Sequence, residues 1–372
     1  MSIVGVTSRR RIRRIAKGIQ GNLLAIPGRL LALIFGILLF LIPAFTSDPY
    51  ILRFLIFTNI FVIFAVSWDF LCGYAGQVSL GHAAFLGISA YTAALLDTRF
   101  GLQPWATIPV GALAGVLGGA LIAIPSLRLR GPYFALATLA FPVILTGLIW
   151  VFPDVTGGEM GISGLHRLSH SGLTDYYIVL VMTAACVVVM WKLTDARSRM
   201  IRTGVILHAI REDEIAARAI GINTVRFKFL AFFVSGFFAG IAGGLYAHTL
   251  RVVGPSTLDL FISIQPVIWT VFGGMVTMYG PAVGVYTLYP LMEVLRFVPE
   301  YRVLIFAFLA IIILTFMPEG IAVWIRDKIE EECPRCKLAN GAWRRYCRAC
   351  GAPLRLEHAP SSGNSSVVGD TK

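Results

Sequence analysis

The stretch GYAGQVSLGHAAFLGISAYTAALL, residues 73–96, decides how this chain folds, because it is a membrane-length segment with an irregular beginning. It contains no Asp, Glu, Lys or Arg and exceeds the roughly 20 residues that a helix needs to cross a bilayer. Its beginning is nevertheless rich in glycine and contains Gln77, Ser79 and His82. Irregular backbone is tolerated in lipid only where protein or water surrounds it. We therefore expect a bent or broken helix start that faces the protein interior.

The composition of the whole chain indicates a polytopic helical membrane protein. The chain has 372 residues, of which 57% are hydrophobic and only 14% are charged, and its mean hydropathy is +0.76. A soluble domain of this size would carry more charge. The net charge of +12 is typical of nucleic-acid-binding proteins. In a membrane protein, however, excess Lys and Arg mostly lie in cytoplasmic loops, so a nucleic-acid partner is not expected.

Apolar segments near the length of a membrane span recur along most of the chain, so we expect an all-α transmembrane bundle of about ten spans. The pair 263–277 and 281–297 is broken by Gly and Pro, and fits either two spans or a bent, re-entrant pair. The predicted segments are 30–46, 50–71, 73–97, 104–125, 132–151, 176–194, 228–249, 263–277, 281–297 and 302–324.

Basic residues gather in alternate loops, which predicts the orientation of the bundle. The N-terminal arm 1–29 and the loops 126–131 and 192–228 are rich in Arg and Lys, whereas the intervening loops are poor in them. The positive-inside rule then places both termini in the cytoplasm, with residues 30–325 in the plasma (inner) membrane.

The basic N-terminal arm and the apolar run after it also resemble a signal peptide. The run is followed by PAFTSDP rather than by a small-x-small cleavage site, and further spans come at once. We therefore expect the first span to be retained.

The glycine-rich stretch has two interpretations. Polar residues inside a membrane commonly mark a pathway. Alternatively, the stretch is a tight helix crossing, in which Gln77 and His82 only form hydrogen bonds with a neighbour. The first interpretation makes these residues the candidate substrate pathway: Gly76, Gln77, Ser79, Gly81, His82 and Gly87.

The long basic loop contains a predicted short helix over residues 204–220. Glu214 and Arg218 form an i,i+4 pair, and Gly221 is well placed to end the helix. Such a helix either lies on lipid headgroups or fits a groove on a partner protein. Its apolar face has few large side chains to bury in lipid, which favours the protein partner.

Five separated segments resemble one known family. GYAGQVSLGHAAFLGISAYTAALL, LRLRGPYFALATLAF (127–141), TGGEMGISGL (156–165), IREDEIAARAIGIN (210–223) and SGFFAGIAGGLYAH (235–248) are similar to the second permease subunit of branched-chain amino-acid ABC importers. The resemblance spans roughly residues 50–320, with the motifs in the same order. One departure lies in GGMVTMYGP (273–281), where Val276 replaces a glycine of the family pattern, which puts a close backbone approach there in doubt.

The resemblance implies an importer of branched-chain, hydrophobic amino acids. It implies four kinds of partner: a second permease, two ATPase subunits, an external substrate-binding protein and membrane lipid. The 204–221 segment would be the coupling helix that docks into the ATPase. Its family pattern resembles E-A-A-x-x-x-G, which Ala216, Ala217 and Gly221 match, while Ile215 stands in place of the Glu. Glu214, one position away, and Arg218 belong to the same helix.

No catalytic site is expected in this chain. It has no G-x-x-x-x-G-K-[ST] loop to hold phosphates, so it is not expected to bind ATP, and the energy must come from another polypeptide. It also lacks HExxH and GxSxG motifs and a paired carboxylate within a span. We therefore expect a transport subunit and not an enzyme.

Four cysteines near the C-terminus have metal-binding spacing. Cys333, Cys336, Cys347 and Cys350 form C-x2-C-x10-C-x2-C, which suits a structural zinc site in a ribbon over residues 329–356. Two disulfides would be disfavoured in a reducing cytosol, and iron is the alternative metal. The Ser- and Gly-rich end, 357–372, is expected to be disordered.

Three rival functions remain from the sequence. The same importer architecture would serve urea or another small polar solute. A stand-alone secondary transporter would need a charged coupling site within the bilayer, for which Glu293 is the only candidate. A membrane-anchored sensor or scaffold would act through the zinc ribbon.

Overall fold

The structure, a computed structural model, describes most of the chain. The basic arm up to residue 26, Arg128, Arg130, much of the predicted 302–324 span, Arg348 and the predicted tail 357–372 lie outside the described residues. The described residues are 27–46, 48–126, 131–195, 203–297, 301, 304–305, 308, 311, 315–317, 319–336, 339–347 and 350–354.

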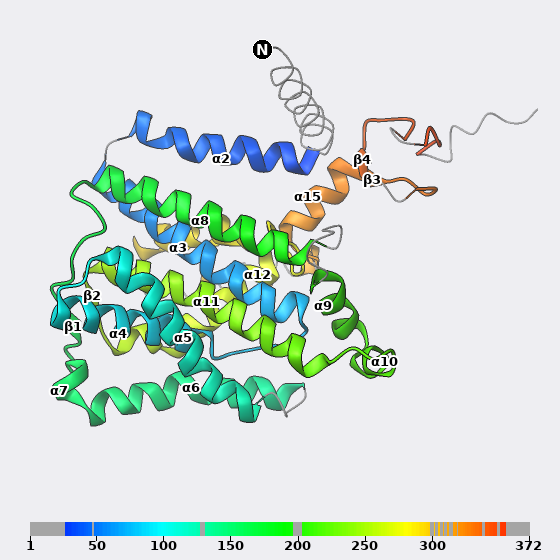
Figure 1. Ribbon diagram of the computed structural model, residues 1–372. Helices are drawn as coiled ribbons and strands as arrows, with labels where there is room; N and C mark the ends of the chain where they lie inside the picture. The colour runs from blue at the N-terminus through cyan, green and yellow to red at the C-terminus, as the bar shows by residue number, and fades with distance from the viewer. Residues whose placement is uncertain are drawn as a thin grey trace, which may run out of the picture. The chain divides into compact units, whose positions relative to one another are not determined.

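Almost all regular structure in the described residues is helical, which confirms the all-α prediction (Figure 1). The α-helices are α2 (Pro27–Phe45), α3 (Pro49–Asp69), α4 (His82–Phe100), α5 (Pro104–Ser126), α6 (Pro132–Val151), α7 (Pro153–Thr156), α8 (Gly172–Thr194), α9 (Thr203–Glu212), α10 (Glu214–Ala219), α11 (Thr224–Leu250), α12 (Leu260–Gly273), α13 (Gly280–Val294) and α15 (Ile321–Ile329). A π-helical turn, η1 (Phe70–Tyr74), extends α3, and η2 (Pro255–Leu258) and η3 (Leu295–Phe297) are 3-10 turns.

Two small antiparallel sheets complete the described secondary structure. Strand β1 (Ile162–Ser163) pairs with β2 (Val252–Val253), so that Ile162 lies opposite Val253. Strand β3 (Glu330–Glu332) pairs with β4 (Ala339–Gly341), with Glu331 opposite Asn340.

Five of the described helices are long and apolar enough to cross a membrane. Shorter apolar helices lie at Leu33–Phe45 and Leu260–Gly273. The five are Pro49–Tyr74, Pro104–Leu121, Pro132–Val151, Gly172–Thr194 and Thr224–Leu250. The segment predicted as a helix over 73–97 becomes helical only at His82, because residues 75–81 are not helical. The broken start that the glycines predicted is therefore real.

The predicted break within residues 263–297 is also present. Helices α12 and α13 contain 14 and 15 residues, which is about 21 and 23 Å of helix and less than the roughly 30 Å hydrocarbon core of a bilayer. Residues 274–279 connect them, and the two helices pack against each other and against α3. This region is thus a hairpin of two short helices.

The chain divides into two compact units, residues 40–323 and residues 1–39 with 324–372. In the first unit α3 is central, because every residue from Thr58 to Asp69 is buried and α8, α11, α12 and α13 pack around it. Helices α4, α5 and α11 form a second set of close contacts. At this contact Gly240 of α11 faces the backbone of Ala112 on α5. A Cβ added to Gly240 would lie 2.7 Å from the Cα atom of Ala112.

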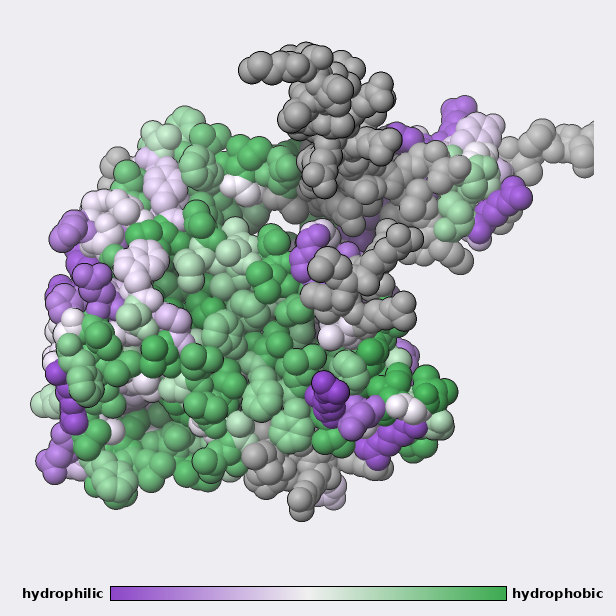
Figure 2. All heavy atoms as spheres, in the orientation of Figure 1, coloured by the Kyte–Doolittle hydropathy of each residue, from purple (hydrophilic) through white to green (hydrophobic). Residues whose placement is uncertain are grey.

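The surface of the 40–323 unit is apolar along the middle of the bundle (Figure 2). Leu113, Leu117 and Leu121 form an exposed stripe along α5, because residues four apart share one helix face. Helices α9 and α10 lie at one end of this unit, and α7, β1 and β2 lie at the other (Figure 1). An apolar middle between two more polar ends is what a membrane-embedded bundle requires.

Candidate functional site

The non-helical stretch 75–81 turns back into the bundle with alternating burial. Gln77 and Ser79 are buried, whereas Gly76 and Val78 are exposed. The indole Nε1 of Trp68 donates to the backbone oxygen of Ser79 at 2.7 Å. Gly76 begins the turn with φ = +69°, a conformation that glycine adopts without steric cost. The stretch therefore presents one face to the interior of the chain and the other to its surroundings.

Close contact with α6 explains the glycine that precedes α4. The amide of Leu80 donates to Thr138 Oγ1 at 3.0 Å, and a Cβ placed on Gly81 would collide with the backbone oxygen of Thr138. Gly87, six residues further along the chain, is packed against the side chain of Leu258. Gly81 and Gly87 are thus packing positions within this subunit.

His82, the first residue of α4, is fully buried. Its Nε2 lies 2.9 Å from Ser67 Oγ, whereas its Nδ1 and the Oε1 of Gln77 are buried without a hydrogen-bond partner among the described residues. Polar atoms left unpaired in an interior are rare and costly, and usually have a functional or hydration-related reason.

A second irregular segment lies close to the end of α3. The amide of Val276 donates to Asp69 Oδ1 at 3.0 Å, and a Cβ on Gly73 would collide with the same carboxylate. Val276 has φ = +64°, which is a left-handed conformation unusual for a β-branched residue. The close approach that Val276 put in doubt is nevertheless present, because a Cβ on Gly273 would collide with the backbone oxygen of Gly280.

The loop between α8 and α11 departs from the single helix predicted over 204–220. It forms two helices, α9 and α10, with a break at Asp213. The Asp213 carboxylate accepts hydrogen bonds from the amides of Ile215 (2.8 Å) and Ala216 (3.0 Å), and so caps the start of α10. The prediction of one helix was wrong because this cap competes with helix continuation.

Glu214 ties α10 to the start of α11. Its carboxylate contacts Arg218, as predicted, and also accepts from Lys228 Nζ at 2.7 Å and Thr224 Oγ1 at 3.2 Å. Burial raises the pKa of Glu214, but its bonds with Lys228 and Arg218 outweigh burial and hold this pKa below the ordinary value. Gly221 has φ = +89° and follows α10, so its predicted role as helix end is confirmed.

Two large apolar side chains are exposed on α10 and directly after it. Ile215 and Ile220 are 71% and 76% exposed, and Ala216 is also exposed. Ala217, in contrast, is only 3% exposed and packs against this chain. Of the predicted coupling residues, the structure therefore brings Ala216, Arg218 and Gly221 to the surface, leaves Glu214 half-buried and places Ala217 inside.

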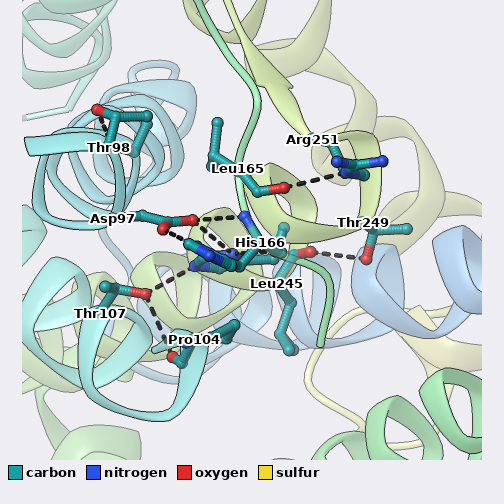
Figure 3. Close-up of polar contacts among 11 residues, drawn as sticks. Asp97, Thr98, Pro104, Thr107, Leu165, His166, Leu245, Thr249 and Arg251 are labelled. Carbon is teal, nitrogen blue, oxygen red and sulfur yellow. Dashed lines mark hydrogen bonds and ion pairs between the residues drawn. The ribbon is translucent and has the colours of Figure 1, made fainter. Parts of the chain in front are cut away.

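A polar network at the opposite end of the unit joins α4, α5, α11 and the loop before α8, and its residues Asp97, Thr107 and His248 are buried (Figure 3). Asp97 accepts the backbone amide of His166 at 2.7 Å and also contacts the His166 ring. His248 Nδ1 lies 2.9 Å from the backbone oxygen of His166, and its Nε2 lies 2.7 Å from Thr107 Oγ1. A second anchor is Arg251, whose Nε donates to the backbone oxygen of Leu165 at 3.0 Å.

Sequence reasoning missed this network. The available signal was a carboxylate, Asp97, at the end of an otherwise uncharged segment, and a histidine, His248, near the end of another. Neither residue indicates its partner, because Asp97 and His166 are 69 positions apart.

The four cysteines converge, as their spacing predicted. Their Sγ atoms all lie within 4.8 Å of one another, with Cys333 and Cys350 3.5 Å apart and Cys336 and Cys347 3.5 Å apart. A tetrahedral zinc ion with Zn–S bonds of about 2.3 Å would require sulfurs about 3.8 Å apart. All four are thiols, and the backbone amide of Cys336 is the main cause of a lowered pKa at Cys333. The donor set and its spacing therefore fit a metal ion.

Membrane-length helices around a broken helix that is buried in the bundle define a multi-pass membrane protein of a kind typical of transporters. A family model described as branched-chain amino acid transport system / permease component matches residues 50–314. The chain belongs to this permease family.

Individual relatives agree with this membership. The high-affinity branched-chain amino acid transport system permease protein LivM of Escherichia coli is 31% identical over 309 residues, covering 77% of this chain and 71% of the relative. The protein of the same name from Salmonella typhimurium is 30% identical over 308 residues, covering 76% and 71%. The ribose import permease protein RbsC of Haemophilus influenzae is 27% identical over 243 residues, covering 64% and 72%.

Proposed function

We propose that this chain is the transmembrane permease subunit of an ABC importer that brings branched-chain, hydrophobic amino acids into a prokaryotic cell. ATP is hydrolysed on two separate ATPase subunits, a second permease completes the membrane passage, and an external binding protein delivers the solute. The observation that carries the proposal is α10, a short helix at one end of a bundle of this permease family, with Ile215 and the following Ile220 exposed.

The geometry of α10 supports a docking role. The Asp213 cap and the contacts of Glu214 with Arg218 and Lys228 hold the short helix rigidly on α11. Ile215 and Ile220 then remain exposed. A rigid helix with an apolar exposed side suits a groove on an ATPase, and it would pass motion directly to α11.

The test is to replace Ile215 and Ile220 together with Asp and to purify the assembled importer. We expect loss of ATPase association and of leucine-dependent ATP hydrolysis, while the permease stays in the membrane. Met160, which is 90% exposed at the opposite end of the unit, provides the matched control: Met160→Asp should leave ATPase association unchanged. Normal assembly of the double Ile variant would refute the docking role.

The stretch 76–87 is proposed as the wall of the passage. Its buried members, Gln77, Ser79, Gly81, His82 and Gly87, hold the backbone in place, and Gly76 and Val78 are the exposed residues that face the passage or the second permease. Val78→Asp should then reduce uptake more than it reduces the amount of folded protein. An equal loss of uptake and of protein would favour a purely structural role.

The cargo is a separate question, because the relatives include a ribose import permease. The second candidate is therefore the same importer serving a small polar solute such as urea or a sugar. Competition against labelled leucine uptake separates the two: isoleucine and valine should compete, whereas urea and ribose should not.

Two further parts of the proposal concern topology and metal. In this proposal α10 lies on the cytoplasmic side of the membrane, where the ATPase subunits are, and both termini lie on the same side. Reporter fusions at residues 3 and 372 should therefore both report the cytoplasm. There, the reduced thiols of Cys333, Cys336, Cys347 and Cys350 would bind one structural zinc ion, since all four positions of a tetrahedral site are filled by protein.

A further inference from the structure

The turn that follows β4 carries an exposed surface that neither transport nor metal binding uses. Trp343 is 71% exposed and Tyr346 is 58% exposed, and Arg344 and Arg345 between them are also exposed. We call these four residues the ribbon patch. Exposed aromatic side chains that lie together commonly mark an interaction site.

The backbone holds the ribbon patch in a defined conformation. The amide of Arg344 donates to the oxygen of Gly341 at 2.9 Å, and the amide of Leu354 donates to the oxygen of Arg345 at 3.0 Å. The Trp343 ring lies over Gly341, where an added Cβ would come within 2.8 Å of it. The patch is thus presented by folded structure rather than by a loose segment.

The chemistry of the patch is that of a membrane–water interface. Trp and Tyr are enriched at the headgroup level of bilayers, and Arg is attracted to anionic headgroups. Residues 343–346 contain two Arg and no Asp or Glu. Nearby, in α15, the Lys328 ammonium lies over the Trp324 ring at 3.7 Å, which adds a second pair of basic and aromatic residues.

Chain length keeps the patch near the bilayer. The match to the permease family ends at residue 314, so Trp343 follows the matched segment by 29 residues. Nine of these residues form α15, about 14 Å of helix, and the hairpin of β3 and β4 folds the chain back on itself. A basic and aromatic surface on so short a tether is held at high local concentration beside lipid headgroups.

We propose that the ribbon patch binds the anionic phospholipid headgroups of the membrane in which the permease is embedded, and so anchors the C-terminal ribbon on the bilayer surface. Trp343 and Tyr346 enter the headgroup layer, and Arg344 and Arg345 pair with phosphates. This proposal depends on the membrane location of the chain and not on its cargo.

The test uses the full-length protein in nanodiscs of phosphatidylcholine alone and of phosphatidylcholine mixed with phosphatidylglycerol. Hydrogen–deuterium exchange reports on the peptide that covers residues 341–346, and brominated phospholipids quench the fluorescence of Trp343. Trp343→Phe identifies the contribution of this residue among the seven Trp of the chain. We expect exchange to slow by roughly an order of magnitude, and quenching of Trp343 to appear, only with the anionic lipid.

Charge variants sharpen the test. Arg344→Glu with Arg345→Glu should abolish the lipid-dependent protection, while Arg344→Lys with Arg345→Lys should keep most of it. Metal analysis of each sample shows whether the cysteine cluster is intact. If the Glu variant loses metal, the proposal is judged only on the exchange of the wild-type protein in the two lipid mixtures. Equal exchange in both lipids, or protection that appears only when the ATPase subunits or RNA are added, would overturn the proposal.

Discussion

The amide of Val276 donates to the carboxylate of Asp69 across 3.0 Å, and the two residues lie 207 positions apart in the chain. This bond joins the end of α3 to the connection between α12 and α13, and holds Val276 at φ = +64°. A β-branched residue pays a conformational cost in that region, of the order of 1–3 kcal/mol, and persists there only when its surroundings require it.

Val276→Gly should therefore stabilise the protein. Glycine adopts the left-handed conformation without the steric cost. Part of the gain is offset by the greater freedom of glycine in the unfolded chain and by the lost contacts of the Val276 side chain with the core. We expect a net gain of about 1 kcal/mol, measured as a rise in Tm of the purified permease. The matched control is Val283→Gly within α13, which should lower Tm. An equal fall in Tm for both variants would show that Val276 is not strained.

Gly81→Ala should destabilise the fold, because the added methyl group would collide with the backbone oxygen of Thr138. Overpacking of this kind costs about 1–3 kcal/mol. Gly147 on α6 is the control, since a Cβ there meets no atom within 4 Å. The yield and Tm of Gly81→Ala should fall, while Gly147→Ala should behave like the wild type; similar behaviour of the two variants would contradict the packing of the broken helix.

Asp97→Ala should loosen the loop before α8. It removes the acceptor for the His166 amide and a carboxylate oxygen 3.7 Å from His248 Nδ1, and the loss of one such hydrogen bond costs about 1 kcal/mol. Hydrogen exchange across residues 157–171 should become faster. Asp154→Ala, an exposed carboxylate on α7, should have no such effect, and unchanged exchange in Asp97→Ala would show that the network does not hold the loop.

The contacts of Glu214 predict how α10 responds to pH. The folded pKa of Glu214 lies below its ordinary value of 4.5, chiefly because hydrogen bonds with Lys228 and Arg218 outweigh burial. The stabilisation by these contacts is therefore fully present at pH values above the ordinary pKa of Glu214. It is lost as the pH falls through the lower pKa of the folded state. Hydrogen exchange of residues 214–224, corrected for intrinsic rates, should accelerate only at such acid pH. Glu214→Gln should lack this acid-induced acceleration of exchange. An acceleration near neutral pH would contradict the assignment of the effect to Glu214.

Serine at Cys333 and Cys350 should remove bound zinc from the full-length protein. Two of four thiolate ligands would be lost, and a tetrahedral site needs all four. Metal analysis after purification is the measurement, with Cys186→Ser, a buried residue of α8, as the control that keeps its metal. If the wild type contains no zinc when purified without chelator, the metal assignment is wrong.

The sequence alone predicted those structural features whose physical cause lies in residues close together along the chain. Apolar runs of bilayer length predicted the helices α3, α5, α6, α8 and α11, because a helix in lipid needs an apolar surface along its whole length. The spacing of four cysteines predicted their convergence, because each C-x2-C pair lies on one short turn. Gly221 predicted a helix end, because its left-handed conformation suits glycine. The cap at Asp213 is local as well, but the helical periodicity on both sides of it predicts one continuous helix.

Tertiary structure alone decided which side chains meet. The glycine-rich stretch predicted irregular backbone, but only packing against Trp68 and Thr138 determined that Gln77 and Ser79 point inward while Gly76 and Val78 remain exposed. Likewise, Asp97 finds His166, and Asp69 finds Val276, through helices brought together by the whole bundle. Periodicity and spacing report on neighbours along the chain, whereas a buried polar atom takes whichever partner the packed bundle brings within about 3 Å.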